Sequence, residues 1–334
     1  MPGAGVTIRP GRDADAAGFI RLIGDCWAEF PGCILDVDGE VPELRALASY
    51  FGQSGGALWA AEAEGTLVGM VATRPLNSDQ AYEICKMYVA RDQRGTGLAH
   101  RLIETAEAHA RAAGAQRLVL WTDTRFDAAH RFYEKRGYVR QGAIRILDDL
   151  SKSLEFRYAK PAAGLVVEAL DAAAAASAER RLSEILVACV AAGASVSYLR
   201  PLAPEAARGF WRKAASDVAG NRRVLLAAWL EGALVGTVQL DLDMPQNQPH
   251  RAGLAMLLVD PAARRRGVAR ALLQRAEQAA QRLGRPLLVL DARAGDVEEP
   301  LYRGLGWQEA GRIPRFALDA DGIEQDAVIF WKRV

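Results

Sequence analysis

The chain contains an internal repeat, and this repeat constrains its fold more than any other feature of the sequence. The same order of features occurs in residues 87–121 (MYVARDQRGTGLAHRLIETAEAHARAAGAQRLVLW) and in residues 257–291 (LLVDPAARRRGVARALLQRAEQAAQRLGRPLLVLD). Each copy has an apolar strand, a basic turn with a glycine, an amphipathic helix, a glycine stop and a second apolar strand. When Gly95 is matched with Gly267, the copies lie about half a chain length apart. That period predicts two tandem domains, because solenoid repeats recur every ~20–50 residues.

The two halves also match outside the repeat. Residues 6–10 and 165–170 read as opening strands, helical material follows each, and two further strands then meet at a Glu-Gly turn. Residues 159–164 (AKPAAG) are typical of a linker. We therefore predict one domain over residues 1–160 and a second over residues 165–334, and a chain of 334 residues is long enough for both.

Helical periodicity and apolar runs predict an α/β (α+β) fold class in each half. The strands that end the two repeats are continuous apolar runs, which suit strands covered by helices on both faces. The predicted apolar faces of the two repeat helices are Leu98, Leu102, Ile103, Ala106, Ala110 and Ala113 in the first and Val268, Leu272, Leu273, Ala276, Ala279, Ala280 and Leu283 in the second.

Composition narrows the classes of function. The formal net charge is +1, from 42 basic and 41 acidic residues, so no basic excess favours a nucleic-acid partner. The four cysteines, Cys26, Cys33, Cys85 and Cys189, form no C-x-x-C pair and are expected to be small buried residues, so no metal is expected. Without a signal pattern or an apolar run of ~18 residues, the expectation is a cytoplasmic protein with no membrane partner.

The glycine turn of each repeat is a candidate anion site. The two turns are Arg94-Gly95-Thr96-Gly97-Leu98-Ala99 and Arg264-Arg265-Arg266-Gly267-Val268-Ala269. Backbone N–H groups at a helix start bind phosphate, and glycine lets the backbone approach it closely. Neither turn fits the Walker pattern, and neither has the third glycine of the dinucleotide fingerprint. The alternative for either copy alone is a glycine helix start with exposed arginines.

The order of strand, arginine-glycine loop, helix, strand and tyrosine-bearing helix resembles the GNAT superfamily of N-acetyltransferases. The superfamily's loop pattern is Gln/Arg-x-x-Gly-x-Gly/Ala. The second loop fits this pattern from Arg264, whereas the first, matched on Gly95, has Asp92 at the opening position. The resemblance implies two GNAT-like domains, each a mixed, mostly antiparallel central sheet flanked by helices, with acetyl-CoA (coenzyme A) as the cofactor.

The second half resembles one group of this superfamily in particular. The segments GASVSYL, NQPHRAGLAMLLV, LLVLDARAG and EPLYRGLGW are similar to the tabtoxin-resistance type of acetyltransferase, which acetylates a small toxin. The related strand of that group carries an acidic residue and a lysine where this chain has Gly253 and Met256.

The resemblance implies direct attack of an amine on a thioester, with a carboxylate as base and a tyrosine as acid. The acid and base are Tyr133 and Glu83 in the first half and Tyr302 and Asp291 in the second. The backbone segments expected to polarise the acetyl carbonyl are Met87, Tyr88 and Val89 in the first half and Leu257, Leu258 and Val259 in the second. The alternatives are a core aromatic for each tyrosine, a solvated strand side chain for Glu83 and a loop cap for Asp291.

We predict an acetyl-CoA-dependent N-acetyltransferase that acts on a primary amine of a small molecule, with a protein amine as the other acceptor. No nucleic acid or membrane is expected as a partner, and the chain is expected to be a monomer or a homodimer. Two alternatives stay open at this point. In one, only one half is catalytic and the other is a degenerate CoA-binding or structural domain. In the other, the chain is a non-catalytic acyl-CoA sensor.

Overall fold

The computed structural model describes residues 5–77 and 80–334, which form two compact units. The first unit comprises Met1–Arg131 and Arg140–Ala163, and the second comprises Phe132–Val139 and Gly164–Val334. Within the second unit, the indole Nε1 of Trp229 donates to the carbonyl of Gly137 at 2.8 Å. The short segment 132–139 thus packs with residues far along the chain.

The helices and strands follow the chain in an order that nearly repeats. Through residue 163 they are β1 (Thr7–Pro10), η1 (Asp13–Asp15), α1 (Ala16–Trp27), η2 (Pro42–Ala46), α2 (Leu47–Gln53), β2 (Ala57–Ala63), β3 (Thr66–Pro75), β4 (Ala81–Val89), η3 (Arg91–Gln93), α3 (Leu98–Ala112), β5 (Arg117–Asp123), α4 (Asp127–Lys135), β6 (Val139–Arg140), β7 (Arg145–Ile146) and β8 (Leu154–Pro161). From residue 164 they are β9 (Leu165–Leu170), α5 (Ala172–Ala191), α6 (Pro204–Ala219), β10 (Arg223–Leu230), β11 (Ala233–Asp241), β12 (Arg251–Val259), η4 (Pro261–Ala263), α7 (Val268–Arg282), β13 (Leu287–Arg293), α8 (Glu299–Gly304), β14 (Gln308–Leu318) and β15 (Glu324–Arg333).

Each unit has its own central sheet. The first sheet has the strand order β1-β2-β3-β4-β5-β8-β6, with β7 paired to β8, and the second has the order β14-β15-β13-β12-β11-β10-β9. Among the pairs whose register is described, only β4–β5 and β12–β13 are parallel. The predicted fold class, a mixed and mostly antiparallel sheet flanked by helices in each half, is confirmed.

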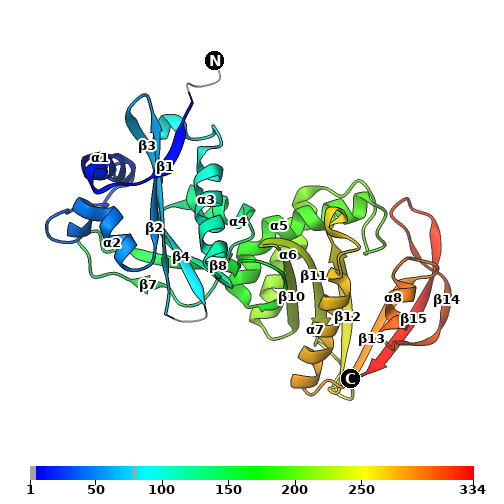
Figure 1. Ribbon diagram of the computed structural model, residues 1–334. Helices are drawn as coiled ribbons and strands as arrows, with labels where there is room; N and C mark the ends of the chain where they lie inside the picture. Colours follow the sequence, from blue (N-terminus) through cyan, green and yellow to red (C-terminus); the bar gives the residue numbers. More distant parts are fainter. Residues whose placement is uncertain (1–4, 78–79) are drawn as a thin grey trace. The chain divides into compact units, whose positions relative to one another are not determined.

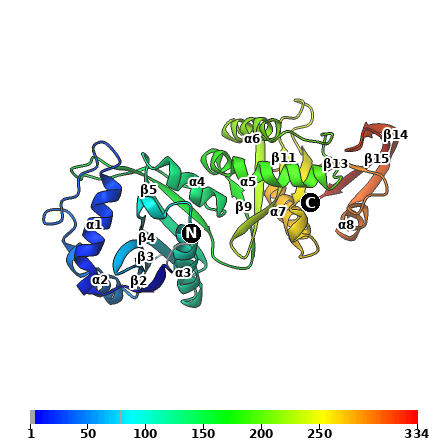
Figure 2. The same cartoon turned by 90° about the horizontal axis from the view of Figure 1, so that it is seen from above.

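Helices cover both faces of each sheet. In the first unit, α1 and α2 pack on one face through an apolar cluster, and α3 lies on the other (Figures 1 and 2). In the second unit, α5 and α6 cover one face, and α7 and α8 cover the other. Strand β4, on which the predicted base Glu83 lies, is one of the strands under α1.

The repeat helices bury most of the predicted positions. Helix α3 buries its predicted leucines, isoleucine and alanines but ends at Ala112, so Ala113 is exposed. Helix α7 ends at Arg282, and Leu283 is 48% exposed beyond it. No sequence signal pointed to Glu107, which is buried on α3 because its carboxylate pairs with the ammonium of Lys160 at 2.9 Å.

The predicted linker is shorter than expected. Strand β8 runs to Pro161, so residues 162–164 alone separate it from β9. Lys160 lies in the predicted linker segment, yet it is 3% exposed, and its ammonium pairs with the carboxylate of Glu107 at 2.9 Å.

One glycine in each unit lets the repeat helix approach the sheet. A Cβ at Gly69 would lie 2.9 Å from Leu102 of α3, and a Cβ at Gly236 would lie 3.1 Å from Val268 of α7 and 2.8 Å from the backbone oxygen of Leu258. Both glycines follow the dipeptide Leu-Val. The repeated tripeptide Leu-Val-Gly is the sequence pattern that could have predicted this close approach of helix and sheet.

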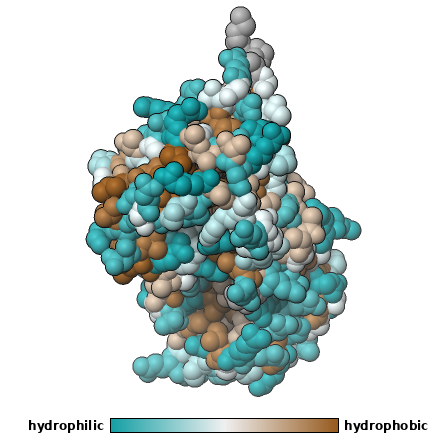
Figure 3. All heavy atoms as spheres, turned by 60° about the vertical axis from the view of Figure 1, so that its left-hand side comes forward, coloured by the Kyte–Doolittle hydropathy of each residue, from teal (hydrophilic) through white to brown (hydrophobic). Residues whose placement is uncertain are grey.

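The surface of the first unit is mixed. Its exposed large apolar side chains are Ile34, Tyr50, Ile144, Ile146, Leu150 and Leu154. Figure 3 shows apolar patches interrupted by hydrophilic side chains. Scattered apolar exposure of this kind is ordinary for a folded surface. Across residues 5–77 and 80–334, no helix combines the length and apolarity that a bilayer crossing requires.

Candidate active site

Two neighbouring parallel strands separate near the middle of each sheet. Strand β4 pairs with β5 only as far as Ile84 and Leu120, although β4 continues to Val89. Strand β12 pairs with β13 only as far as Gly253 and Val289. Among residues 5–77 and 80–334, the backbone groups that face each gap therefore have no strand partner, and an extended amide chain can pair with them as an added strand.

Each strand beside the gap has a β-bulge just beyond the point of separation. Lys86 and Met87 together oppose a single residue of β3, and Lys86 has a φ of +49°. Met256 and Leu257 together oppose a single residue of β11, and Met256 has a φ of +53°. A bulge turns the strand and redirects its backbone groups. The segments predicted to polarise the acetyl carbonyl begin at these bulges.

The backbone of the two glycine turns corrects the alignment made from the sequence. Gly97 and Gly267 immediately precede α3 and α7, and both are left-handed, with φ of +91° and +83°. Gly95 therefore corresponds to Arg265, and both of these residues are left-handed as well. The match of Gly95 with Gly267 is wrong, because a turn with two glycines offers two choices and only the start of the helix decides between them.

The corrected alignment makes the two loops equivalent to the pattern of the superfamily. The first loop now reads from Arg94, with Gly97 and Ala99 at the two small positions. Asp92 lies outside the pattern, so the departure expected in the first half does not exist. The remaining difference is Arg265, an L-residue held in the left-handed region where the first unit has glycine.

Both loops fit a pyrophosphate. No atom lies within 4 Å of the place that a side chain would occupy at Gly95 or Gly97, and at Gly267 only a leucine side chain lies near, at 3.9 Å. In the described part of the chain, the backbone N–H groups of Gly95, Thr96 and Gly97 donate to no protein acceptor. These N–H groups and the helix dipole favour an anion at this point.

The arginine that opens each loop contacts the last carbonyl of the preceding strand. Arg94 Nε donates to Val89 O at 3.2 Å, and Arg264 Nε donates to Val259 O at 3.5 Å. The two units repeat this contact, so the loop and the strand beside the gap are joined in the same way in both.

A buried cysteine reaches the same carbonyl in each unit. Cys26 Sγ lies 3.6 Å from the carbonyl of the first unit, and Cys189 Sγ lies 3.3 Å from that of the second. Burial raises the pKa of both thiols, so both are neutral donors rather than thiolates. The expectation of small buried residues holds for these two cysteines, and their contact with the loop strand is an addition that the sequence did not reveal.

The electrostatic surroundings of the two loop arginines differ. The guanidinium of Arg94 pairs with Glu29 through contacts of 2.6 and 2.8 Å, and this pair lowers the pKa of Glu29. The second unit has Ala192 at the corresponding place, three residues after its cysteine. The second loop therefore presents three exposed arginines without this neutralising carboxylate.

The carboxylate predicted as the base of the first unit lies on the sheet face that α1 and α2 cover. Glu83 is 5% exposed, and its Oε2 accepts from Nε and Nη2 of Arg74 on β3, at 2.7 and 2.6 Å. The alternative of a solvated strand glutamate is wrong, because the side chain is buried. Within the described residues no hydrogen bond reaches Oε1, which leaves that oxygen able to accept a proton.

Cys85 follows on the same face of β4 and is not a nucleophile at neutral pH. Burial raises the pKa of its thiol to about 12. A thiol that stays protonated cannot carry an acetyl group by direct attack on a thioester. The first unit therefore favours direct attack by an amine over a covalent acetyl-cysteine.

In the second unit the predicted base is in a different environment. Asp291 is exposed on β13 beside the gap, and within the described chain its side chain makes no hydrogen bond or ion pair. The alternative of a loop cap is wrong, because no backbone N–H of the described residues donates to it. The strand position that corresponds to Glu83 holds Gly253, which faces Asp241 on β11.

Tyr302 lies in the core of the second unit. It is 5% exposed, with ring contacts to Trp307 at 6.0 Å and Phe330 at 5.6 Å. Burial and the nearby carboxylate of Glu298 raise its pKa well above the ordinary tyrosine value. Burial, with Asp296 alongside, also raises the pKa of Glu298. A tyrosine that holds its proton this firmly is a weak general acid.

Tyr133 lies on α4 among other aromatic rings. It is 8% exposed, and its ring contacts Phe132 at 5.5 Å and Tyr138 at 5.9 Å. The first turn of α4 is held to the end of β5 by His130, whose Nε2 lies 2.9 Å from the carbonyl of Asp123. Burial lowers the pKa of His130, so the neutral ring donates this hydrogen bond and has a structural role.

The gap, the bulge and the anion loop occur in the same order in both units, and comparison with known proteins agrees. The family model described as "Acetyltransferase (GNAT) family" matches residues 21–138 and 167–307. The chain belongs to the GNAT acetyltransferase family. The family's donor, acetyl-CoA, is the group that the two loops and gaps fit.

Individual relatives of the GNAT chain match only parts of it. N-acetylaspartate synthetase of Xenopus tropicalis is 34% identical over 95 residues, which are 28% of this chain and 35% of that protein. An uncharacterised N-acetyltransferase of Escherichia coli (strain K12) is 36% identical over 100 residues, which are 29% of this chain and 59% of that protein. The chain thus spans less than two thirds of the length of either relative.

Solved structures align with about half of the chain. A putative acetyltransferase from Salmonella typhimurium, solved with its cofactor acetyl-CoA, has 17% identity and a TM-score of 0.42 over 51% of this chain and 94% of that one. The ribosomal-protein-alanine N-acetyltransferase of Brucella melitensis has 20% identity and a TM-score of 0.43 over 51% of this chain and 99% of that one.

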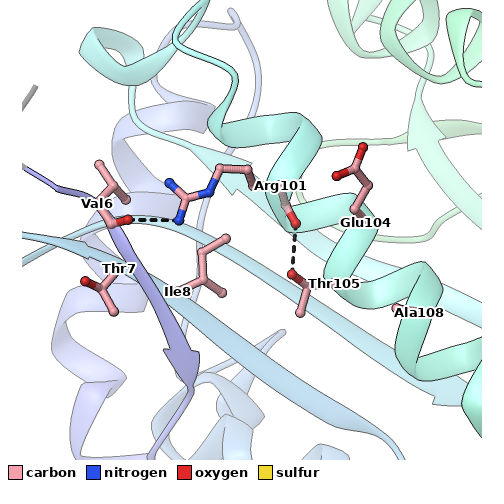
Figure 4. A pocket seen from close by; sticks show the side chains of 7 residues that line it. All are labelled: Val6, Thr7, Ile8, Arg101, Glu104, Thr105 and Ala108. Carbon is pink, nitrogen blue, oxygen red and sulfur yellow. Dashed lines mark hydrogen bonds between the residues drawn. The ribbon is translucent and has the colours of Figure 1, made fainter. Parts of the chain in front are cut away.

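Two open cavities of the first GNAT unit lie away from its gap. One, of about 630 Å³, opens between β1 and α3 (Figure 4) and is lined by Val6, Thr7, Ile8, Arg101, Glu104, Thr105 and Ala108. In this cavity Arg101 reaches across from α3 and donates to the carbonyl of Val6 at 2.9 Å. The other, also about 630 Å³, borders the loop at Gln93 and Thr96. The lining of neither cavity includes a residue of β4 or β5, the two strands that border the gap.

Proposed function

We propose that both units bind acetyl-CoA at the loop and gap and transfer its acetyl group to a primary amine of a small molecule. The observation that carries this proposal is the repeated sequence of strand gap, bulge and left-handed glycine before a helix. An anion loop alone would suit many ligands, but the adjoining gap also suits an extended amide chain that ends at the bulge. When bound, acetyl-CoA supplies the activated thioester.

In the proposed mechanism, side chains from the first half of the sequence transfer the protons. Glu83 Oε1 accepts a proton from the amine while Arg74 holds the carboxylate in place, and the freed nitrogen can then attack. Backbone groups at Met87, Tyr88 and Val89 polarise the acetyl carbonyl. The hydroxyl of Tyr133 gives a proton to the departing sulfur.

The second unit has the same parts in other surroundings. Leu257, Leu258 and Val259 correspond to the backbone donors, and Tyr302 corresponds to the acid. Asp291 is the base candidate taken from the sequence. Because the pKa of Tyr302 is raised, proton delivery to sulfur is expected to be slower here than in the first unit.

The proposed acceptor is a small amine. The near-neutral net charge of +1 gives no support for a strongly acidic or nucleic-acid acceptor. The likeness of the second half to the tabtoxin-resistance type of acetyltransferase, which acts on a small toxin, supports a small molecule. A protein amine is the competing acceptor, and we expect it to be a poorer substrate.

Two single substitutions separate the units in a test. Thr96→Glu and Arg266→Glu each put a carboxylate into one exposed loop, where it repels the pyrophosphate. Acetyl-CoA should raise the melting temperature of each single variant but not of the double variant, because only a ligand of the native state stabilises it. Release of free CoA with a panel of primary amines should persist in each single variant and vanish in the double. Stabilisation without turnover in any variant would indicate a sensor and contradict the proposal.

A second candidate is an enzyme with one working unit. The observation in its favour is that the second unit lacks the acidic residue and lysine of the bulged strand, where it has Gly253 and Met256, and buries Tyr302. On this alternative, Thr96→Glu abolishes all turnover, whereas Arg266→Glu leaves it unchanged. Full activity in the Arg266→Glu variant would therefore assign catalysis to the first unit alone.

A further inference from the structure

In each unit, two residues face each other across the strand beside the gap and its neighbour, and we call such a facing pair a row. The carboxylate of this row lies on a different strand in the two units. In the first unit, Arg74 on β3 faces Glu83 on β4. In the second, Asp241 on β11 faces Gly253 on β12. Each row lies three residues before the bulge of the strand beside the gap. The second unit thus keeps a carboxylate in the row, but one strand farther from the gap, and a glycine takes the place beside it.

The side chain of Asp241 points to the face where the first unit has its base. A Cβ at Gly253 would lie 3.6 Å from the Cβ of Asp241, so the two positions are side by side on one face. The α5 and α6 cluster includes Leu225, and Gln239 opposite it is two residues before Asp241, so strand alternation puts Asp241 on that same face.

Among the described residues, no basic side chain pairs with Asp241. Its Oδ1 accepts the backbone N–H of Asp243 at 3.0 Å, and no hydrogen bond to Oδ2 occurs in residues 5–77 and 80–334. Arg223 lies opposite on β10, but its guanidinium donates to Gln239 and lies 3.6 Å from Asp217 instead. Within the described residues, Oδ2 of Asp241 therefore accepts no hydrogen bond, like Oε1 of Glu83 in the first unit.

The strand between Asp241 and the gap leaves room for a ligand. Gly253 and Ala255 are the β12 residues of this face nearest Asp241, with Arg251 and Met256 on either side of them, so no long side chain of β12 lies directly beside Asp241. A Cβ at Gly253 would meet only Asp241 at 3.6 Å and the methyl of Met244 at 3.9 Å. Methionine is flexible and can move aside when a ligand enters.

We propose that Asp241, in place of the sequence candidate Asp291, is the carboxylate that accepts the proton of the acceptor amine in the second unit, and that the acceptor reaches it across Gly253. The ammonium proton moves to Asp241 Oδ2, and the freed nitrogen forms a bond to the acetyl carbon. The carbon–sulfur bond breaks with its electron pair on sulfur, which takes the hydroxyl proton of Tyr302, and the second proton of the new amide nitrogen returns to the Tyr302 oxygen. This role rests on the proposed acetyltransferase function, and it moves the amine by about one strand spacing, ~4.8 Å, relative to the first unit.

The test uses the full chain with the first loop disabled by Thr96→Glu, so that only the second unit turns over. The probes are acetyl-CoA and a panel of primary amines that includes putrescine, lysine and glycinamide. Asp241→Asn should lower kcat by about 100-fold or more, leave the KM for acetyl-CoA unchanged and remove the low-pH limb of the kcat/KM profile. The matched control, Asp243→Asn, removes an exposed carboxylate two residues away and should change none of these.

A second variant separates chemistry from folding. Asp241→Asn combined with Gly253→Glu restores a carboxylate to the row, at the strand position of Glu83, and should recover part of kcat and the low-pH limb. A loss of kcat without any change of the pH profile would mean a structural role and overturn the proposal, as would an unchanged kcat in Asp241→Asn.

Failure of the wider function is distinguishable in the same experiment. If the Thr96→Glu chain turns over no amine of the panel, the role of Asp241 is overturned. Turnover in the Arg266→Glu chain, where only the first unit works, then shows that the proposed function stands for the first unit. The absence of turnover in both chains would overturn both proposals.

Discussion

The first unit pairs its buried carboxylate Glu83 with an arginine on the next strand and balances its loop arginine with Glu29. The second unit, within the described residues, has a carboxylate without a basic partner on β11, one strand farther from the gap, and a loop with three exposed arginines. The gap, bulge and helix start are the same in both. The parts that bind the shared donor are thus alike, and the parts that meet an acceptor differ, as expected of two units that share a donor and differ in acceptor.

The largest expected effect concerns the base of the first unit. In a chain whose second loop is disabled by Arg266→Glu, Glu83→Gln should lower kcat by about 100-fold or more, because the amine loses its proton acceptor. Steady-state release of CoA across a range of pH measures the change. Glu64→Gln, at an exposed turn of the same unit, is the control. A kcat within about twofold of the parent would remove the main contrast between the units.

The two tyrosines test whether the units differ in proton delivery. Tyr133→Phe should slow release of CoA by about 10- to 100-fold in the first unit. Tyr302→Phe should have a smaller effect in the second, because its raised pKa makes Tyr302 the weaker acid from the start. Each variant is measured with the other loop disabled, and CoA binding followed by thermal shift should be unaffected. Equal losses would mean that burial of Tyr302 does not limit the second unit.

At the contact between repeat helix and sheet, replacing glycine by alanine is expected to destabilise the second unit more than the first. Gly236→Ala should destabilise its unit by about 1–3 kcal/mol, because the new methyl meets a backbone oxygen at 2.8 Å that cannot move. Gly69→Ala should cost less, since its neighbours are side chains that can shift. Calorimetric melting resolves the two transitions.

Two glycines are controls for this pair of substitutions. Gly52 and Gly304 lie in helices with no neighbour near the added methyl, so alanine there should be neutral or slightly stabilising. If Gly236→Ala proves as mild as these controls, α7 is not held against the sheet at this point.

The loop charges are expected to give a modest difference in affinity. Glu29→Gln should tighten acetyl-CoA binding to the first unit by up to about fivefold, because Arg94 no longer shares its charge with a carboxylate. Ala192→Glu should weaken binding to the second unit by a similar factor. Calorimetric titration at low and high salt measures both, and the differences should shrink as salt rises. Changes of the same sign in both variants would contradict the comparison.

The smallest expected effect is on the pH dependence of stability. The folded pKa of Glu298 is raised by burial, so its favourable contribution is present at low pH and is lost as pH rises through the folded pKa. Glu298→Gln should therefore raise the melting temperature of the second unit by a few degrees at neutral pH. The gain should disappear below the ordinary glutamate pKa of about 4.3. A gain that is independent of pH would point to packing instead.

Local sequence patterns predicted most of the fold. The repeat, the two glycine turns and the apolar helix faces are all properties of residues close together in sequence, and the structure confirms the two mixed sheets that they predicted. The position of Glu107 was beyond such reasoning. A glutamate inside an apolar helix face looks solvated until Lys160, from a strand much later in the chain, is brought beside it.

The sequence by itself determined that this is a tandem GNAT chain, because a repeated loop before a helix is readable as a linear pattern. Only the tertiary structure decided which glycine of the first loop precedes the helix, since Gly95 and Gly97 are the same residue type and the backbone alone shows that α3 starts directly after Gly97. It also decided that Asp241 shares a row with Gly253. That pairing depends on strand register, which the turns and bulges set, and no spacing along the chain encodes it directly.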